Sequence, residues 1–337
     1  MSEERIITAE EKPEDKNLDL TLRPKLLKDY VGQAKIKANL TIFMEAARKR
    51  KEPIEHVLLH GCPGLGKTTL AHVIAQEMAA SIRVTSGPAI ERAGDLAAII
   101  TNLADGDVLF IDEIHRLQRT VEEVLYPAME EFVIDMVVGK GPSAQTIRLD
   151  LPRFTLIGAT TRVSSVSSPL RDRFGAVFHL DYYSDEDIEK IISRAAKILG
   201  VKMDKEAMVE IAKRARKTPR VANRLLKRVR DYAQVKADGN INQDLARAAL
   251  DMLDIDTMGL DAVDRKILET LIDRFQGGPT GVNSIAASVG QEMATIEDVY
   301  EPFLLQIGFL ARTARGRVVT DRAYEHLGRQ KSQSKLV

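Results

Sequence analysis

Short apolar runs alternate with segments of helical periodicity in the first half of the chain. The runs cover residues 56–60, 108–112 and 155–160. Runs of this length are typical of strands that are buried on both faces of a parallel sheet. Residues 68–80 have the helical pattern expected after the first run. The alternation predicts an α/β domain with a parallel sheet and crossover helices.

Residues 132–151 interrupt this pattern between the second and third runs. Polar and apolar positions alternate there around the sequence Gly139-Lys140-Gly141-Pro142. Alternation on both sides of a glycine- and proline-rich turn predicts a β-hairpin that projects from the domain.

The pattern changes after Tyr183, where apolar residues recur at helical spacing. The first stripe contains positions 188, 191, 192, 195 and 198, and Gly200 is expected to end that helix. Residues 203–254 continue with helical patterns and without a strand pattern. We therefore predict a large α/β domain over residues 1–183 and a small all-α domain over residues 184–254.

A third domain is predicted over residues 255–337. Apolar stripes predict helices around 263–271, 285–289 and 295–306, and Thr295 with Asp298 resembles a capping box at the start of the last helix. Residues 309–320 then alternate around Arg315-Gly316, as strands of a hairpin do. Three helices followed by a hairpin predict a winged-helix architecture.

Bulk composition narrows the class of protein. The 337 residues are 44% hydrophobic and 29% charged with a formal net charge of zero, so DNA binding would depend on local basic patches. No run approaches the ~20 apolar residues of a membrane span, and the first 20 residues lack an apolar signal core. We expect a cytoplasmic protein with no membrane partner. The single cysteine, Cys62, excludes an intramolecular disulfide and a cysteine-based zinc site.

The sequence Gly61-Cys62-Pro63-Gly64-Leu65-Gly66-Lys67-Thr68 matches the phosphate-loop pattern GxxxxGK[ST]. Glycines such as Gly64 and Gly66 let backbone N–H groups close around phosphates. Lys67 reaches the β- and γ-phosphate oxygens, and the Thr68 hydroxyl binds Mg²⁺. A strand before the loop and a helix after it aim the helix N-terminus at the anion. The pattern predicts binding of ATP with Mg²⁺.

An acidic pair follows the apolar run 108–112. Asp112 can hold Mg²⁺ through water, and Glu113 can polarise the water that attacks the γ-phosphate. The transition state also needs a positively charged side chain beside the γ-phosphate, and Arg171 and Arg173 are candidates for it. Taken alone, such an arginine-aspartate-arginine triplet is more often an ion-paired turn. Together these motifs predict ATP hydrolysis.

Several motifs occur in one order along the chain. They are Leu22-Arg23-Pro24, Tyr30-Val31-Gly32-Gln33, the phosphate loop, residues 109–117, 122–130, 158–161 and 170–175, Thr218-Pro219-Arg220, Gly308-Phe309-Leu310 and Arg315-Gly316-Arg317. In this set and order the chain resembles the RuvB family of AAA+ ATPases, from about Leu22 to about Gly328. The resemblance implies an AAA+ P-loop domain, a helical lid domain and a C-terminal winged-helix domain.

The resemblance implies residue roles that spacing does not give. Leu22 and Arg23 would lie beside the adenine and ribose, with Tyr183 on the other side. Thr160 or Thr161 would be the polar sensor between the metal site and the γ-phosphate.

Two arginines receive roles in the same way. Arg220 would be the sensor arginine that the lid supplies to its own chain's nucleotide. Arg173 would be the arginine finger, acting in trans on the ATP of the neighbouring subunit. The further nucleotide contacts implied by the resemblance are Thr69, Glu130, Glu131 and Phe132.

The resemblance also implies a function and partners. It implies an ATP-driven motor for branch migration of Holliday junctions, in homologous recombination and DNA repair. The expected partners are four-way junction and duplex DNA, RuvA bound through the hairpin 132–151, and RuvC during resolution. A finger that acts in trans requires a ring, which we expect to be a homohexamer.

Two basic segments suggest DNA contacts. Arg312, Arg315 and Arg317 lie in a stretch, 302–320, that has no acidic residue. On a winged-helix hairpin they are expected to bind backbone phosphates without sequence preference, the alternative being a solvated basic turn. Residues 213–230 are also basic, but helical spacing spreads their charges around. We expect a solvated face there, with Arg220 at the nucleotide.

Cys62 departs from the resemblance, because this position is usually proline in the family. It is either a tolerated spacer or, as a sharper hypothesis, a thiol whose alkylation blocks ATP binding. Two other functions stay open on the sequence alone. A clamp-loader ATPase would lack the winged helix, and an ATP-gated regulator that reads DNA sequence would have less need of Glu113 and Arg173.

Overall fold

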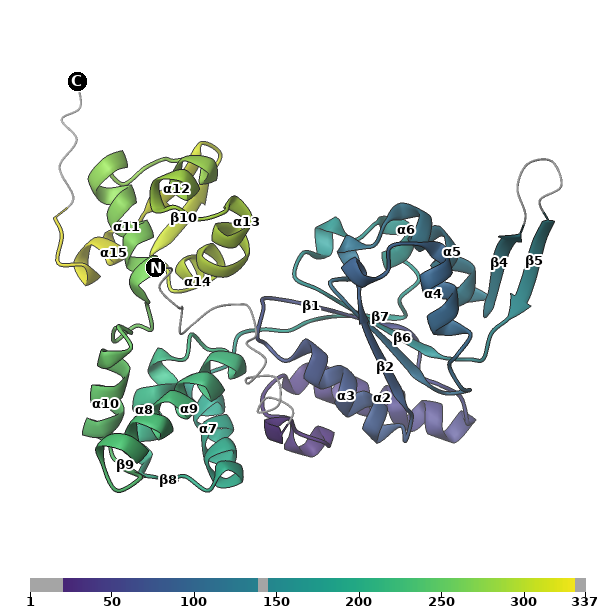
Figure 1. Ribbon diagram of the computed structural model, residues 1–337, viewed down its shortest axis with the longest axis horizontal. Coiled ribbons are helices and arrows are strands. Elements are labelled where there is room, and N and C mark those ends of the chain that lie inside the picture. The colour runs from purple at the N-terminus through teal and green to yellow at the C-terminus, as the bar shows by residue number, and fades with distance from the viewer. Residues whose placement is uncertain (1–20, 139–144, 331–337) are drawn as a thin grey trace. The chain divides into compact units, whose positions relative to one another are not determined.

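Five parallel strands form the sheet predicted from the apolar runs. In this computed structural model, which describes residues 21–138 and 145–330, their order is β2-β3-β6-β1-β7 (Figure 1). The strands are β1 Val57–His60, β2 Ile82–Ser86, β3 Val108–Asp112, β6 Thr155–Thr160 and β7 Ala176–His179. The three predicted strands are found to within one residue. β2 and β7 were not predicted, because they lie at the sheet margins, are partly exposed and therefore lack a continuous apolar run.

Helices cover both faces of this sheet. They are η1 Leu27–Asp29, α2 Ala34–Arg50, α3 Lys67–Glu77, η2 Gly87–Ala89, α4 Ala93–Ile100, η3 Ile114–Arg116, α5 Arg119–Glu130, η5 Val163–Ser165 and α6 Ser168–Arg171. Helices α2 and α3 lie on one face, and α4, α5 and α6 on the other (Figure 1). On the second face, Leu58 and Leu109 of the sheet join Leu125 and Leu170 of the helices in one fully buried cluster. This core fixes the position of the helices that follow β3 and β6.

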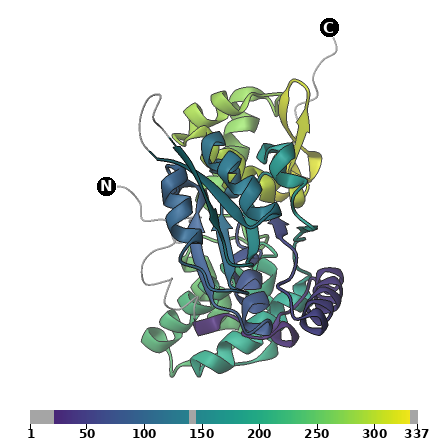
Figure 2. The same cartoon turned by 90° about the vertical axis from the view of Figure 1, so that its right-hand side faces the viewer.

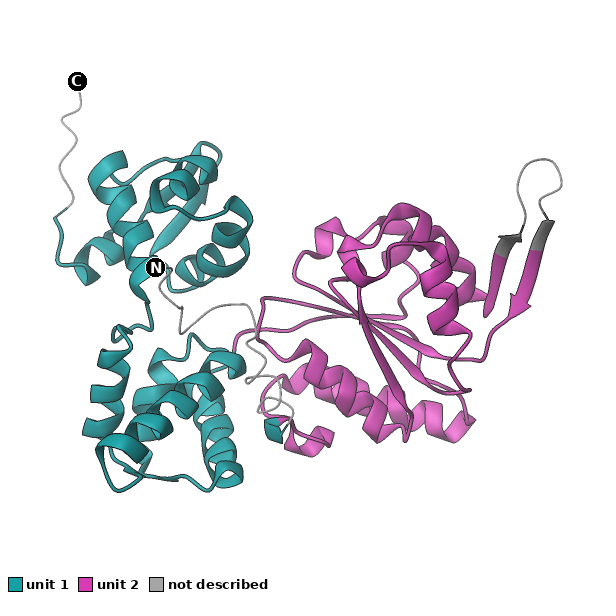
Figure 3. Ribbon diagram, in the orientation of Figure 1, with its two compact units in different colours: residues 1–22, 183–337 teal, residues 23–182 magenta. Residues whose placement is uncertain are grey.

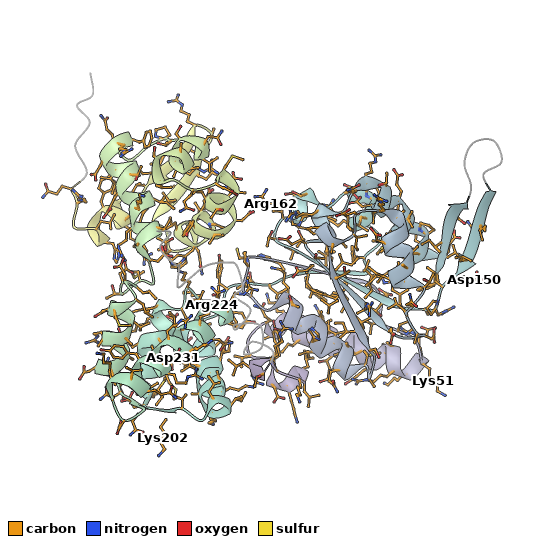
Figure 4. All side chains as sticks on the ribbon, viewed as in Figure 1. Lys51, Asp150, Arg162, Lys202, Arg224 and Asp231 are labelled. Atoms are coloured by element: carbon orange, nitrogen blue, oxygen red, sulfur yellow. The ribbon has the colours of Figure 1, made fainter. Side chains whose placement is uncertain are left out.

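The hairpin predicted between the second and third runs is present. It consists of β4 Val133–Val138 and β5 Gln145–Asp150, which pair antiparallel with Val133 opposite Asp150. The two strands project away from the five-stranded sheet (Figure 1; Figure 2), and Figure 4 labels Asp150 where β5 rejoins the domain. The predicted turn, residues 139–142, lies outside the described residues.

Residues 183–337 with 1–22 form a second compact unit, separate from residues 23–182 (Figure 3). Its first part contains the helices α7 Asp185–Leu199, α8 Lys205–Arg214, α9 Pro219–Lys236 and α10 Gln243–Met252. Gly200 ends α7 in the left-handed conformation, as predicted. The prediction that this part has no strands is wrong. β8 Lys202–Met203 pairs in parallel with β9 Asn240–Ile241, and strands of two residues leave no periodic signal.

The basic run 213–230 differs from its prediction as a solvated face. Most apolar residues of the run are buried, but so are Arg214, Arg216 and Arg224, which are 1%, 7% and 9% exposed. Arg214 pairs with Glu210 and Asp251, and Arg216 pairs with Asp261 and Asp264. The acidic partners lie outside the run, so its own composition gave no sign of them.

The C-terminal part has the predicted winged-helix elements. They are α11 Ala262–Phe275, α12 Val282–Val289, α13 Met293–Thr295, the π-helix η6 Ile296–Tyr300, α14 Glu301–Gln306, β10 Leu310–Thr313, β11 Gly316–Val319 and α15 Asp321–His326. The predicted capping box at Thr295 is wrong. Thr295 has helical dihedrals inside a helical stretch that begins at Met293, and its side chain makes no capping bond.

No helix in the described part of the chain has both the length and the apolar character needed to cross a membrane. Residues 1–20, which contributed to the cytoplasmic prediction, lie outside the described residues.

Candidate active site

The phosphate loop connects the end of β1 to the start of α3, as the sequence predicted. Gly61 has φ of +145°, and a Cβ there would lie 2.6 Å from the carbonyl oxygen of Leu180. Gly64 and Gly66 also have positive φ, at +81° and +98°. The chain therefore needs glycine to make this turn, which leaves the first backbone N–H groups of α3 unpaired within the helix and available to an anion.

Lys67 folds back over this loop. Its Nζ donates to the carbonyl oxygens of Gly61 at 2.7 Å and Cys62 at 2.9 Å, and the residue is 8% exposed. These bonds hold the ammonium group above the loop at the position from which it can reach a phosphate. Thr68, the next residue, lies in the first turn of α3 with a partly exposed side chain. The loop, Lys67 and Thr68 therefore lie together at the N-terminus of α3.

Asp112 and Glu113 lie where β3 ends. We call this side of the sheet, where β1, β3 and β6 end, the carboxyl edge. Asp112 Oδ1 accepts a 3.0 Å hydrogen bond from the backbone N–H of Glu113. Glu113 has φ of +48°, and its Oε2 accepts a 3.0 Å hydrogen bond from Nη1 of Arg116. The left-handed backbone at Glu113 turns the chain at the end of β3, where η3 begins.

Thr160 ends β6, the strand between β1 and β3. The residue is 1% exposed, and its Oγ1 lies 2.9 Å from His115 Nδ1 and accepts a 2.9 Å bond from the backbone N–H of Arg162. Its hydroxyl thus connects the end of β6 to the segment that follows Glu113. The structure brings the phosphate loop, Asp112, Glu113 and Thr160 together at the carboxyl edge. His115 received no separate role from the sequence, since histidine next to an acidic pair is not distinctive.

Arg173 lies at the opposite side of the sheet. It precedes β7, whose first residue bonds back to the carbonyl of His56, immediately before β1. We call this side, where the strands begin, the amino edge. A four-residue parallel strand spans roughly 13 Å between the two edges. Within its own domain Arg173 is therefore separated from the phosphate loop by the length of β1.

The guanidinium of Arg173 is held at the amino edge. Its Nη1 donates a 2.6 Å bond to the carbonyl of Pro169, its Cζ lies 4.4 Å from the centroid of the Tyr126 ring, and its Nε lies 3.2 Å from Glu130 Oε1. Arg171, the other candidate, is half-buried and donates a 3.4 Å hydrogen bond to Ser168. The sequence gave Tyr126 no role, although Glu122, Tyr126 and Glu130 are spaced four residues apart, which places them along one side of α5.

The predicted nucleotide contacts at residues 130–132 also lie at the amino edge. Glu130 pairs with Arg173, and Glu131 Oε2 is 3.6 Å from Arg148 of the hairpin. Phe132 packs edge-to-face on Phe154, with ring centroids 5.9 Å apart. The structure does not bring these residues to the phosphate loop of their own domain.

His56 lies at the amino edge, immediately before β1. Its Nδ1 accepts a 2.9 Å bond from the backbone N–H of Leu156, so its Nε2 carries the proton donated to the carbonyl of Met129 at 3.0 Å. Burial lowers the pKa of His56, and the bond to Met129 opposes that effect. The imidazole therefore serves as a neutral connector between β1, β6 and α5.

The remaining predicted nucleotide contacts are divided between the two units. Arg23 belongs to the unit of the phosphate loop, where burial and then the charge of Arg23 lower the pKa of His72. Leu22, Tyr183 and Arg220 belong to the other unit. There Leu22 accepts a 2.6 Å bond from Arg194, the backbone N–H of Tyr183 donates to the carbonyl of Lys217, and Arg220 follows Pro219 in the first turn of α9.

The three predicted DNA-binding arginines differ from one another. Arg317 is held by a buried carboxylate: its Nη2 donates to Glu301 Oε2 at 2.9 Å and to Glu297 Oε1 at 3.1 Å, and Glu301 is 1% exposed. The hydrogen bond to Glu301 is the main cause of the raised pKa of Arg317. Arg312, opposite Arg317 in the strand pair, also bonds to Glu301 but has a side chain 57% exposed. Arg315 is exposed at the turn.

Three family models together match almost all of the described chain. A model described as the P-loop domain of the Holliday junction DNA helicase RuvB matches residues 22–180. The RuvB AAA lid domain matches residues 183–256, and the RuvB C-terminal winged helix domain matches residues 257–328.

Solved structures give the same result. The structure of Thermotoga maritima RuvB, described as a Holliday junction branch migration motor, is 52% identical with a TM-score of 0.84, covering 92% of this chain and 99% of that one. A mutant of the same protein is 51% identical with a TM-score of 0.85 and the same coverage. The P-loop domain, the lid and the winged helix, together with the full length of the match, show that the chain is an ATPase that belongs to the RuvB family.

Proposed function

We propose that this chain is the subunit of an ATP-driven homohexameric motor that moves the branch point of Holliday junctions. The observation that carries the proposal is the separation of Lys67 and Arg173 at opposite edges of one sheet. When the phosphate loop and the finger lie at opposite edges, the finger of one chain can complete the phosphate site of its neighbour. A closed ring repeats that contact at every interface.

The residues of the carboxyl edge have the donor types for ATP hydrolysis with Mg²⁺. The Thr68 hydroxyl and the Asp112 carboxylate are hard oxygen ligands, which Mg²⁺ prefers beside phosphate oxygens. When bound, the ion neutralises charge that develops on the phosphates. Lys67 would exchange its two loop carbonyls for β- and γ-phosphate oxygens. Glu113 would accept a hydrogen bond from the attacking water once it leaves Arg116, and Thr160 would contact the γ-phosphate.

The contacts to the base and ribose are proposed from membership of the RuvB family. We assign Leu22 and Arg23 to one side and Tyr183 to the other, with Thr69 on the phosphates beside Thr68. Arg220 would reach the γ-phosphate from the lid. Also on the basis of family membership, we divide the chain into domains at residues 183/184 and 254/255.

The finger side would serve the next subunit. Arg173 would place its positive charge on the neighbour's γ-phosphate, where it stabilises the transition state. Glu130, Glu131 and Phe132 lie with it at the amino edge, so their proposed nucleotide contacts are also made to the neighbour's ATP.

The partners follow from exposed surfaces and from family membership. We propose that the hairpin 132–151 binds RuvA, since Ile147 and Leu149 are 44% and 37% exposed there. RuvC would join during resolution of the junction, in homologous recombination and DNA repair in the cytoplasm. Four-way junction and duplex DNA would meet the wing. Arg312 and Arg315 are exposed cations of the wing. Arg317 would contribute by stabilising the hairpin and by adding to the positive electrostatic potential of the wing.

The test is conversion of a fluorescently labelled four-way junction to duplex products in the presence of ATP-Mg²⁺ and the cognate RuvA. The wild type is expected to convert the junction, and Lys67→Ala is expected not to. Glu113→Gln serves as a second control that should bind ATP and the junction without conversion. If the wild type hydrolyses ATP but leaves the junction intact, the motor proposal is wrong and a clamp-loader or regulator role takes its place.

A further inference from the structure

We propose that Tyr126 is the positioning residue of the arginine finger, so that helix α5 of one subunit sets the finger that acts on the next subunit. The inference rests on the proposed trans role of Arg173. In this proposal the aromatic ring of Tyr126 does not touch the nucleotide. It orients the guanidinium of Arg173, which does.

The Tyr126 ring supports the face of the Arg173 guanidinium, and hydrogen bonds hold its rim. The Arg173 Cζ lies 4.4 Å from the ring centroid, inside the range of a cation–π contact. Pro169 fixes one end of the guanidinium through its carbonyl. The carboxylate of Glu130 lies 3.2 Å from Nε and accepts a 3.4 Å hydrogen bond from Nη2, while Nε itself makes no hydrogen bond to a described residue. The carbonyl and the carboxylate bind the rim of the guanidinium, whereas the Tyr126 ring covers its face.

The ring is in turn fixed by a small polar group. The Tyr126 hydroxyl donates to Glu122 Oε2 at 3.1 Å, and the Ser167 hydroxyl donates to the same oxygen at 2.6 Å. Ser167 caps α6, which leads directly to Arg173. Glu122 is 7% exposed, so its two bonds join α5 to the segment that carries the finger. Burial is the main cause of the raised pKa of Tyr126, which keeps this hydroxyl a donor.

The same helix leads back to the metal site of its own subunit. Asp112 and Glu113 end β3, η3 follows at once, and α5 begins at Arg119. Ile114, Val121 and Leu125 along this path are fully buried in one cluster. A rearrangement at Glu113 therefore has a short, packed route to Tyr126 and so to the finger.

The first test compares two substitutions of the ring. Tyr126→Leu keeps apolar bulk but removes the ring face, and Tyr126→Phe keeps the face. Because an arginine finger contributes on the order of 10³-fold or more to kcat, a misplaced finger should cost Tyr126→Leu roughly 10- to 100-fold in kcat. The Kd for a fluorescent ATP analogue should be unchanged in both variants. Tyr126→Phe should stay within about threefold of wild type, because the cation–π contact remains.

The second test asks whether the defect acts in trans. Tyr126→Leu subunits keep an intact phosphate site, and Glu113→Gln subunits keep an intact finger. Mixed in equal amounts, they should hydrolyse ATP faster than the sum of the two separate preparations, because some interfaces then pair an intact site with an intact finger. Damage to the variant's own site would give no such recovery.

A parallel mixture separates this inference from the proposed function. Arg173→Ala mixed with Glu113→Gln should also recover activity if the finger acts in trans. If that mixture fails to recover, the trans role itself is wrong. If it recovers and the Tyr126→Leu mixture does not, or if Tyr126→Leu retains wild-type kcat, the positioning role of Tyr126 is overturned.

Discussion

Arg216 Nη2 donates a 2.6 Å hydrogen bond to Asp264 Oδ2, and Asp264 is completely buried at the start of α11. Arg216 also donates to the carbonyl of Gly259 and lies 4.9 Å from the centroid of the Phe303 ring. The residue stands four positions before Arg220, in the short connection between α8 and α9. One guanidinium from the lid is thus inserted into the winged-helix part of the same compact unit.

Removing the carboxylate of this pair should strongly destabilise that unit. Burial raises the pKa of Asp264 to about 7, although Arg216 opposes the shift, so the experiment belongs at about pH 8 where the carboxylate is ionised. Asp264→Ala removes the fully buried one of the two carboxylates that pair with Arg216 and leaves only Asp261. It should lower the free energy of unfolding by about 3 kcal/mol, measured by urea denaturation. Asp231→Ala, which breaks partly exposed pairs with Arg228 and Arg230, should cost less than about 1 kcal/mol. Equal losses would contradict the role assigned to burial.

The wing arginines should separate into a DNA contact and a structural group. Arg315→Ala should weaken duplex binding and reduce the slope of log K against log salt concentration by about one. It should leave the unfolding temperature unchanged. Arg317→Ala leaves Glu301 buried without its bidentate partner and should lower the unfolding temperature. Fluorescence anisotropy at several salt concentrations and thermal unfolding measure the two effects. A stable Arg317→Ala protein with weak DNA binding would assign Arg317 to the phosphates instead.

His56 should remain neutral when an ordinary histidine is protonated. Its folded pKa is lowered from 6.5, so as the pH falls below about 6.5 the unfolded chain takes up the proton first, and stability contributed by His56 is lost as the pH passes through the folded value. ¹⁵N chemical shifts of the His56 ring, followed through a pH titration, should give a midpoint below 6.5, with the proton of the neutral ring on Nε2. A midpoint at or above 6.5 would contradict this account.

Alkylation of Cys62 should block nucleotide binding. The Cys62 carbonyl accepts the Lys67 ammonium at 2.9 Å, and burial, followed by a hydrogen bond to Cys62, raises the pKa of Tyr182 beside it. A bulky adduct in this half-buried loop should displace the backbone that cradles phosphate and weaken binding on the order of tenfold or more. Since the protein has one cysteine, Cys62→Ala treated with the same reagent is the control. Unchanged affinity after complete labelling would leave Cys62 as a tolerated spacer.

Buried periodic segments could be predicted from the sequence, and contacts between distant segments could not. β3 and β6 were predicted to the residue because strands buried on both faces leave a continuous apolar run. The pairing of Arg216 with Asp264 spans 48 positions, and no local pattern records it. The same limit applies to Glu301, which lies one residue before the stretch that looked free of acid.

The site shows the same division. The phosphate loop and the Asp112-Glu113 pair follow a local pattern, since one strand and its turn build each of them. The contact of Tyr126 with Arg173 depends on how α5 packs beside α6, which spacing on α5 alone could only suggest.

The placement of Lys67 and Arg173 at opposite edges also gives every subunit a polarity. Under the proposed trans role of Arg173, one edge of the chain accepts a neighbour's finger and the other edge supplies one, so the contacts between subunits run head-to-tail. An isolated pair of subunits joined this way has one complete site and one unfilled donor edge. ATP turnover per chain should therefore rise with protein concentration until the subunits form a closed ring. Dilution alone should abolish ATPase activity without unfolding the protein.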